Sequence, residues 1–244
     1  MPLENATAWV TRASSGIGEA TVHALAARGA DLVLVARRRE ALESTASDVE
    51  REHGVEAVVA DGDVRDRATS EAAVEAAVDR LGGLDIVVAN AGIGRGGDVE
   101  TMTDEEYAAM QETNVDGTFF LTRAALPRLR ESEGTLVVVG SFAGRFPRSF
   151  NPVYAATKWW VRGFAHSVAA QVGDDGVAVS VINPSEVRTE FGSEEGEPFE
   201  ERFEPGTVTE PAEVAEAIAF AAERPGSSAQ EIDLFRRDKY AESF

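Results

Sequence analysis

The chain has 244 residues and a mass of 26.0 kDa, which suits one α/β domain with a full hydrophobic core. It contains no cysteine, which excludes disulfides and thiolate metal sites, and its three histidines (His23, His53 and His166) stand far apart without ligand spacing, so we expect no metal. The formal net charge of −20 argues against nucleic acid or an anionic membrane surface as a partner.

Short apolar runs alternate with longer segments of helical pattern along nearly the whole chain. The runs are rich in Val, Ile and Leu without alternation, which is typical of strands buried on both faces of a parallel sheet. The expected strands are 7–11, 32–36, 57–60, 85–89, 135–140, 177–182 and 231–235. The expected helices are 16–28, 39–53, 68–81, 104–130, 152–172 and 211–224, the last with Thr209 as its N-cap.

This alternation predicts right-handed βαβ units. We therefore expect a single α/β domain over residues 1–244, with a doubly wound, parallel, seven-stranded sheet of the Rossmann type and helices on both faces. One stretch, 190–205 (EFGSEEGEPFEERFEP), is irregular and acidic and follows the sixth expected strand. It is a candidate substrate flap beside the ligand crevice, and its charge fits a solvated surface loop equally well.

The first expected strand leads into a glycine-containing turn and then a helix, in the segment TRASSGIG at 11–18. Glycines allow a tight turn and close approach of the backbone to a ligand, and the helix N-terminus offers free N–H groups to a diphosphate. The strand, turn and helix order is the context that a dinucleotide-binding motif requires. The segment therefore predicts a dinucleotide site.

Three arginines, Arg37, Arg38 and Arg39, follow the second expected strand. Folds that prefer NAD place a carboxylate there for the ribose 2′-hydroxyl, whereas arginine suits the 2′-phosphate of NADP. The position therefore favours NADP(H). The alternatives are an NAD-dependent enzyme and arginines that only begin the next helix, where their charge would oppose the helix dipole.

Tyr154 and Lys158 stand four residues apart in an expected helix and so share one face. A free phenol with a pKa near 10 is a poor acid–base catalyst, and a neighbouring ammonium lowers that pKa. Lys158 is one of only two lysines, with Lys239, in a chain that otherwise uses arginine, so lysine itself is expected to matter there. Ser141 ends a buried strand upstream and completes a candidate catalytic group.

These segments together resemble the short-chain dehydrogenase/reductase family over almost the whole chain. The resemblance rests on the glycine motif at 11–18, Asp63-Val64, Asn90-Ala91-Gly92, Asn114 in TNVDG, Ser141 in GSFAG, the Tyr154/Lys158 pair, and NPSEVRT at 183–189. It implies an NAD(P)-dependent oxidoreductase that acts on a ketone or secondary alcohol.

The resemblance also implies residue roles. Tyr154 would exchange a proton with the substrate oxygen, Ser141 would polarise that oxygen, Lys158 would bind the nicotinamide ribose and lower the Tyr154 pKa, and Asn114 would hold a relay water. The implied cofactor-binding residues are Thr11, Arg12, Ser14, Ser15, Gly16, Ile17, Gly18, Arg37, Arg38, Asp63, Val64, Asn90, Ala91, Gly92, Tyr154, Lys158, Pro184, Val187 and Thr189.

Two positions depart from the family pattern. Arg12 replaces the first glycine of the motif; it would either obstruct the cofactor or reach the 2′-phosphate beside Arg37, and we favour the second reading. Ser185 replaces the glycine of N-P-G, and because it is still small we expect little effect.

The chain end, AQEIDLFRRD, resembles a subset of NADP-dependent reductases that includes enzymes acting on serine or 3-hydroxy acids. Candidate pocket residues are apolar or basic, and each is equally compatible with a surface or interface role. They are Phe142, Phe146, Phe150, Phe191, Arg95, Arg145 and Arg148.

Two other function classes are compatible with the same fold. A nucleotide-sensing regulator usually lacks the Tyr or the Lys, and both are present; a dehydratase or epimerase usually has an additional C-terminal domain. The family implies a homodimer or homotetramer built on 104–130 and 152–172, with one of Trp159 and Trp160 in the core and the other at an interface. The N-terminus resembles no signal peptide and no stretch is long enough to span a bilayer, so we expect a cytoplasmic protein. The acid-rich, lysine-poor composition resembles that of proteins from salt-loving microbes; the alternative is an ordinary acidic protein from a mesophile.

Overall fold

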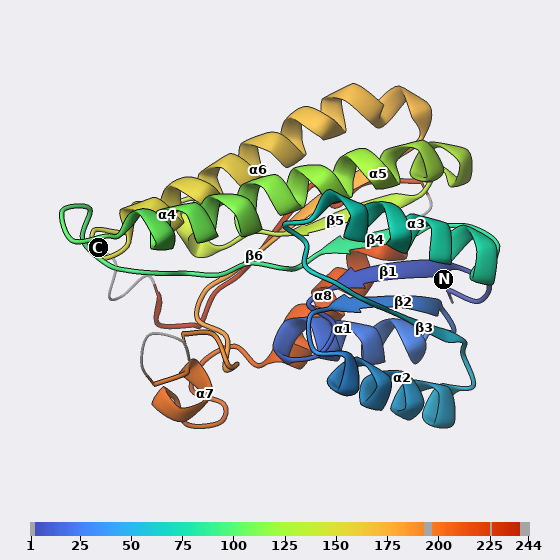
Figure 1. The fold of residues 1–244 in the computed structure, drawn as a ribbon, viewed down its shortest axis with the longest axis horizontal. Helices are drawn as coiled ribbons and strands as arrows, with labels where there is room; N and C mark the ends of the chain where they lie inside the picture. Colours follow the sequence, from blue (N-terminus) through green and yellow to red (C-terminus); the bar gives the residue numbers. More distant parts are fainter. Residues whose placement is uncertain (1–2, 193–196, 225, 240–244) are drawn as a thin grey trace.

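Seven strands form one parallel sheet in the order β3-β2-β1-β4-β5-β6-β7 (Figure 1). The computed structural model describes residues 3–192, 197–224 and 226–239. The strands are β1 Thr7–Thr11, β2 Asp31–Ala36, β3 Ala57–Asp61, β4 Ile86–Ala89, β5 Thr135–Val139, β6 Ala178–Pro184 and β7 Glu231–Leu234. The seven-stranded doubly wound α/β domain expected from the sequence is thus confirmed.

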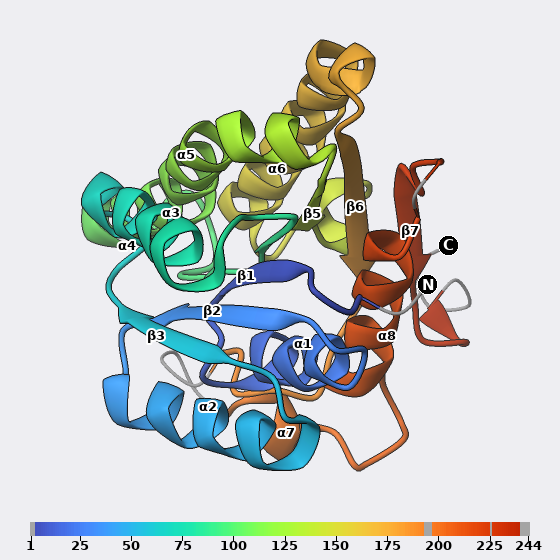
Figure 2. The same ribbon diagram turned by 90° about the vertical axis from the view of Figure 1, so that its right-hand side faces the viewer.

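Helices cover both faces of the sheet (Figure 2). One face is covered by α1 Gly16–Ala26, α2 Arg39–His53 and α8 Pro211–Ala222, the other by α3 Arg67–Leu81, α5 Gly117–Ser132 and α6 Pro152–Val172. The central strands, flanked on both sides, contribute the most completely buried residues. Among the residues that the structure describes, no helix is both long and apolar enough to cross a membrane.

Three expectations about helices need correction. The helix expected at 104–130 is divided into α4 Asp104–Met110, a π-helical turn Gln111–Asp116, and α5. The N-cap of α8 is Glu210 rather than Thr209, because Glu213 accepts the backbone N–H of Glu210 at 2.8 Å. Neither Trp159 nor Trp160 is in the core, at 48% and 37% exposed, because the buried face of α6 carries Lys158, Val161 and Ala165 instead.

The carboxyl ends of the strands define where a ligand can lie. Successive strands run outward from β1 in one direction to β3 and, after a long crossover, in the other direction from β4 to β7. The loops after β1 and β4 therefore diverge and leave a crevice at that end of the sheet. The glycine turn follows β1, and the segment Asn90-Ala91-Gly92 follows β4.

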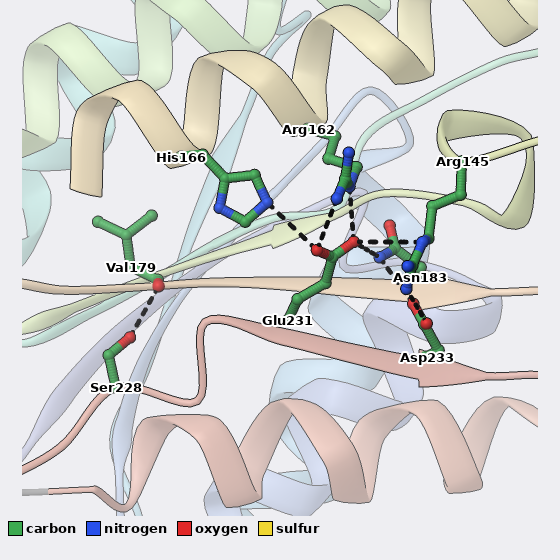
Figure 3. Close-up of polar contacts among 8 residues, drawn as sticks. All are labelled: Arg145, Arg162, His166, Val179, Asn183, Ser228, Glu231 and Asp233. Carbon is green, nitrogen blue, oxygen red and sulfur yellow. Dashed lines mark hydrogen bonds and ion pairs between the residues drawn. The ribbon is translucent and has the colours of Figure 1, made fainter. Parts of the chain in front are cut away.

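An ion cluster attaches the edge strand β7 to the sheet and to α6 (Figure 3). Glu231 on β7 accepts two hydrogen bonds from Arg162, at 2.7 and 3.0 Å, and lies 3.3 Å from His166. Asn183 on β6 donates to Glu231 at 2.7 Å and to Asp233 at 3.0 Å. The hydrogen bonds from Arg162 are the main reason that the pKa of Glu231 is lowered, to about 2.

We expect Glu231→Gln to destabilise the protein by about 2 kcal/mol at pH 7. A depression of the pKa from 4.5 to about 2 corresponds to at most about 3 kcal/mol, and partial exposure and screening reduce it. Because the folded-state pKa is below the unfolded one, this stabilisation is full above pH 4.5 and is lost as the pH falls toward 2. Thermal unfolding from pH 7 to pH 3 measures it, with Glu75→Gln as an exposed control. If Glu231→Gln and wild type had the same Tm at pH 7 and the same fall in Tm between pH 7 and pH 3, the stabilising role of Glu231 would be contradicted.

Candidate active site

The crevice contains two adjoining hollows of about 420 and 350 Å³. The larger lies over Ser141, Tyr154 and Lys158, and the smaller over Arg37 and Arg38. All the site residues expected from the sequence line one or both hollows except three, Thr11, Gly18 and Asn114. The fold thus brings the two ends of the expected site into one continuous crevice.

Two of the exceptions, Thr11 and Gly18, hold the backbone behind the residues that line the hollows. The Thr11 hydroxyl accepts the backbone N–H groups of Asn90 and Ala91, at 2.9 and 3.1 Å, and so joins the ends of β1 and β4. A Cβ on Gly18 would stand 2.0 Å from the Arg12 carbonyl oxygen, so only glycine lets α1 begin this close to the turn.

Arg12 adopts a left-handed backbone conformation, with φ of 52°. Its guanidinium donates to the Gly92 carbonyl oxygen at 2.8 Å, and the residue lines both hollows. Its charge contributes to lowering the pKa of both Lys158 and Tyr154. The guanidinium therefore lies between the two ends of the crevice and within electrostatic range of the catalytic group.

The smaller hollow has the chemistry of an anion site. Arg38 donates to the Ser14 carbonyl oxygen at 3.2 Å and pairs with Glu190 at 3.3 Å. Asp63, one of the expected cofactor-binding residues, pairs with Arg65 at 2.7 Å, and this contact is the main cause of its lowered pKa. Arg39 turns outward to pair with Glu43 at 2.8 Å and with Asp61. Only Arg37 and Arg38 of the three consecutive arginines line the hollow.

The candidate catalytic group lies where the first half of α6 meets the end of β5. Asn151 caps this helix by accepting the Tyr154 backbone N–H at 3.2 Å, and Pro152 stands in the first turn. The buried Lys158 ammonium donates to the Val139 carbonyl oxygen, at the end of β5, at 2.9 Å. Ser141 follows the same strand, and it lines the same hollow as Tyr154. Helix α6 and strand β5 thereby fix Tyr154, Lys158 and Ser141 together.

The pKa values of the group are shifted mainly by burial. Burial raises the pKa of Tyr154, opposed by the Ser141 hydrogen bond and by the charges of Arg148 and Arg12. Burial and then Arg12 lower the pKa of Lys158 to about 8. In the protein without cofactor, desolvation of the phenolate outweighs the nearby cations, so the pKa of Tyr154 lies above its ordinary value. The expected lowering by Lys158 stays a prediction.

Asn114 lies in the π-helical turn between α4 and α5, and it is buried. Its side chain accepts the Ile93 backbone N–H at 2.8 Å and donates to the Ile93 carbonyl and to Thr157, at 2.8 and 3.0 Å. A Cβ on Gly92 would stand 3.4 Å from the Asn114 Oδ1 and 3.2 Å from the Lys158 Nζ. The two side chains therefore flank the same glycine.

Aromatic rings and Arg148 form part of the remaining wall of the larger hollow, which Arg12 and Arg202 also line. The Phe191 ring lies 5.8 Å from the Tyr154 ring and 5.6 Å from Phe199, which belongs to the short helix α7 Phe199–Arg202. Of the expected pocket residues, Phe142, Phe150, Phe191 and Arg148 line this hollow. Phe146 instead stacks on Phe142, at a centroid distance of 4.5 Å.

The three candidate arginines have different surroundings. Arg145 binds Asp233 in the β7 ion cluster, and Arg95 lines the smaller hollow. Arg148 lines the larger hollow, where its guanidinium stands 4.7 Å from the Phe142 ring centroid and 3.5 Å from Glu186. Arg148 is therefore the candidate that faces a substrate beside Tyr154.

Sequence reasoning missed three residues of this site. Asn151 caps α6, and Glu190 pairs with Arg38 across the crevice. Lys239 is buried and its ammonium binds Glu186, which lines the larger hollow. The scarcity of lysine was a signal for Lys239, whereas nothing in the sequence pairs Glu190 with Arg38.

Comparison with known proteins assigns this architecture to a family. The family model described as short chain dehydrogenase matches residues 6–199. The chain belongs to the short-chain dehydrogenase family. Among relatives, 3-oxoacyl-[acyl-carrier-protein] reductase FabG from Vibrio cholerae is 33% identical over 91% of each chain.

Solved short-chain dehydrogenases share the fold closely. An alcohol dehydrogenase from the archaeon Thermococcus sibiricus, complexed with 5-hydroxy-NADP, has a TM-score of 0.86 at 30% identity, over 95% of this chain and 97% of that one. A 3-ketoacyl-(acyl-carrier-protein) reductase from Brucella melitensis, complexed with NADH, has a TM-score of 0.85 at 28% identity, over 96% and 98%. Neighbours of the fold thus bind either nicotinamide cofactor, and the chain is an oxidoreductase of this family.

Proposed function

We propose that this short-chain dehydrogenase is an NADP(H)-dependent oxidoreductase that interconverts a ketone and a secondary alcohol, with Tyr154 as its general acid and base. One observation carries the proposal: Ser141, Tyr154 and Lys158 line one hollow, and this hollow adjoins a second one that Arg37 and Arg38 line. A bound nicotinamide supplies the hydride acceptor or donor.

The side chains supply the proton and the electrostatics. Tyr154 donates its phenolic proton to the carbonyl oxygen during reduction and accepts it back during oxidation. Ser141 donates a hydrogen bond to the same oxygen as negative charge develops there. The Lys158 ammonium would favour the phenolate that remains. Asn114 lies beside Gly92, near that ammonium, and would hold a water that returns the proton.

The preference for NADP(H) rests on Arg37 and Arg38. Both line the smaller hollow, where a guanidinium matches the geometry of a 2′-phosphate. Arg12 stands nearer the middle of the crevice, so we now assign it to the diphosphate rather than to the 2′-phosphate first favoured. Pro184, Val187 and Thr189 would hold the nicotinamide end. The test is a screen of carbonyls and alcohols with both cofactors, following the absorbance of reduced nicotinamide at low and high salt.

For the substrate we propose an oxo or hydroxy acid with an apolar chain. Arg148 supplies the cation and the Phe142, Phe150 and Phe191 rings supply the apolar wall. Glu186 lines the same hollow, and the Lys239 ammonium neutralises it. This agrees with the resemblance of the chain end to reductases of serine or 3-hydroxy acids.

We expect Arg148→Gln to raise KM for an oxo acid about tenfold or more and to leave KM for its methyl ester unchanged. A hydrogen bond to a charged group contributes about 1.5–3 kcal/mol, which corresponds to roughly tenfold or more. Arg145→Gln makes the same charge change outside the hollow and is the control. Equal effects of Arg148→Gln on acid and ester would refute this substrate class, whereas loss of turnover with every carbonyl would refute the function itself.

We also propose that the protein comes from a halophile and depends on salt. The chain has 43 acidic and 23 basic residues, and both of its lysines are buried. We expect Tm to rise by several degrees between about 0.1 and 1 M KCl, because the screening length falls from about 10 to 3 Å. Sucrose of equal osmolality, which is excluded from protein surfaces but does not screen charge, is the control. A Tm that does not change with KCl concentration, or that rises as much in sucrose as in KCl, would contradict the proposal.

Three further assignments remain proposals. The stretch 190–205 acts as a substrate flap, supported by Phe191 and α7 on the larger hollow; residues 193–196 of it lie outside the described part. The protein is cytoplasmic. It forms a homodimer or homotetramer through α5 and α6, supported by the exposed Phe119, Trp159 and Trp160.

A further inference from the structure

Two histidines that are distant in the sequence lie side by side in the fold. His23 is in the last turn of α1, and His53 is in the last turn of α2, next to Glu52. One ligand atom from each of the three residues lies within 4.8 Å of the others. His23 and His53 are thus close in space although they stand far apart in the sequence, whereas His166 lies elsewhere, in the β7 ion cluster.

We propose that His23, Glu52 and His53 form a binding site for a divalent transition metal ion, with Zn²⁺ or Ni²⁺ as the fitting class. Two imidazoles and one carboxylate are a donor set that these ions bind, whereas Mg²⁺ prefers an all-oxygen set. Three protein ligands leave a fourth position for water.

The geometry needs only small side-chain movements. Ligand atoms around tetrahedral zinc lie roughly 3.3–3.5 Å apart, given metal–ligand bonds of about 2.0–2.2 Å. Separations of up to 4.8 Å therefore require shifts of about 1 Å, and Glu52 and His53 are exposed and free of core packing. His23 is half-buried and fixes one side of the site.

The backbone around the site also favours a cation. Both histidines lie in the carboxyl-terminal turns of their helices, where the last carbonyl groups carry partial negative charge. Helices α1 and α2 contact each other on the same face of the sheet (Figure 2). Arg51 pairs with Glu52 at 3.0 Å and competes with the metal, but this arginine also has Asp48 at 2.6 Å.

A metal here would link the far ends of two helices that begin at the cofactor crevice. Helix α1 starts at the glycine turn and α2 starts just after Arg37 and Arg38. The site itself lies at the opposite helix ends, away from Tyr154. We therefore expect the metal to stabilise the fold. We also expect substitutions at these three residues to leave the turnover of the metal-free enzyme unchanged.

The test is thermal unfolding and calorimetric titration with ZnCl₂ and NiCl₂ at constant ionic strength. A metal at about 100 times its Kd should raise Tm of a chain this size by about 5 °C or more. We expect one equivalent to bind wild type, and His53→Ala or His23→Gln to lose at least tenfold in affinity. Glu52→Gln should lose affinity while Glu40→Gln, the same charge change at the start of α2, should not. His166→Gln should also keep the full Tm rise.

Two outcomes would overturn the site. MgCl₂ raising Tm as much as ZnCl₂ would mean that the acidic surface binds divalent ions generally. An undiminished zinc shift in the double variant His23→Gln/His53→Ala would place the metal elsewhere. Each variant is compared with its own metal-free Tm, so a loss of basal stability does not disguise either result.

Discussion

Tyr154→Phe is expected to lower kcat/KM for carbonyl reduction about 10³-fold while binding of NADPH stays intact. The substitution removes one hydroxyl, and general acid catalysis contributes about 10²–10⁴-fold. The Asn151 side chain accepts the Tyr154 backbone N–H, and Tyr154 lines the same hollow as Ser141, so we expect the substitution to remove only the proton donor. Steady-state rates together with quenching of protein fluorescence by NADPH separate catalysis from binding.

Tyr107→Phe is the matched control. It removes the same hydroxyl group outside the crevice, because Tyr107 lies on α4 and is 50% exposed. It should retain wild-type kcat/KM. If Tyr154→Phe kept more than a tenth of the wild-type rate, Tyr154 would not be the proton donor. If it lost NADPH binding as well, the variant would report on the pocket rather than on the chemistry.

Lys158→Met is expected to lower kcat/KM about 10²-fold and to abolish a fall in activity above pH 8. The ammonium has a pKa of about 8 in the cofactor-free protein, depressed from 10.5, so it loses its proton as the pH rises through that value. The pH profile of kcat/KM for NADPH reports the free enzyme. Tyr154 does not explain such a limb, because burial moves its pKa upward.

Arg12→Gly provides the complementary change. Burial is the larger cause of the lowered Lys158 pKa and Arg12 is the second, so removing the guanidinium should move the basic limb to higher pH. Glycine also suits the left-handed φ of 52°. We expect KM to rise by a similar factor for NADPH and NADH. A rise in KM for NADPH alone would show that Arg12 binds the 2′-phosphate. A basic limb of the pH profile that moved to lower pH would contradict the effect of the Arg12 charge on Lys158.

Much of the fold could be predicted from local sequence patterns. Unbroken Val, Ile and Leu runs predicted the strands because a parallel sheet covered on both faces needs apolar side chains on both. The sequence pattern did not predict the π-helical turn at 111–116, in which Asn114 hydrogen-bonds the backbone of Ile93, a residue of the loop after β4. The predicted N-cap of α8 was wrong by one residue. Glu210 is the N-cap and forms a capping box with Glu213, whereas Thr209 lies one residue before it.

Within the site, the sequence predicted which residues take part better than what each one faces. Arg95, Arg145 and Arg148 are alike in sequence, and the fold directs them to the smaller hollow, to Asp233 and to the larger hollow respectively. The same is true of His23 and His53, which meet only because α1 and α2 pack together. Spacing along the chain has no information on such contacts between elements.

The central claim is that the crevice turns over NADP(H) rather than merely binding it. The direct measurement is the ratio of kcat/KM for NADPH to that for NADH with the best carbonyl of a broad panel, measured at high salt. We predict turnover with both cofactors and a ratio of about ten or more in favour of NADPH, because only NADPH offers a 2′-phosphate to Arg37 and Arg38. Tight binding of NADPH without turnover of any carbonyl, or a ratio below one, would contradict the account.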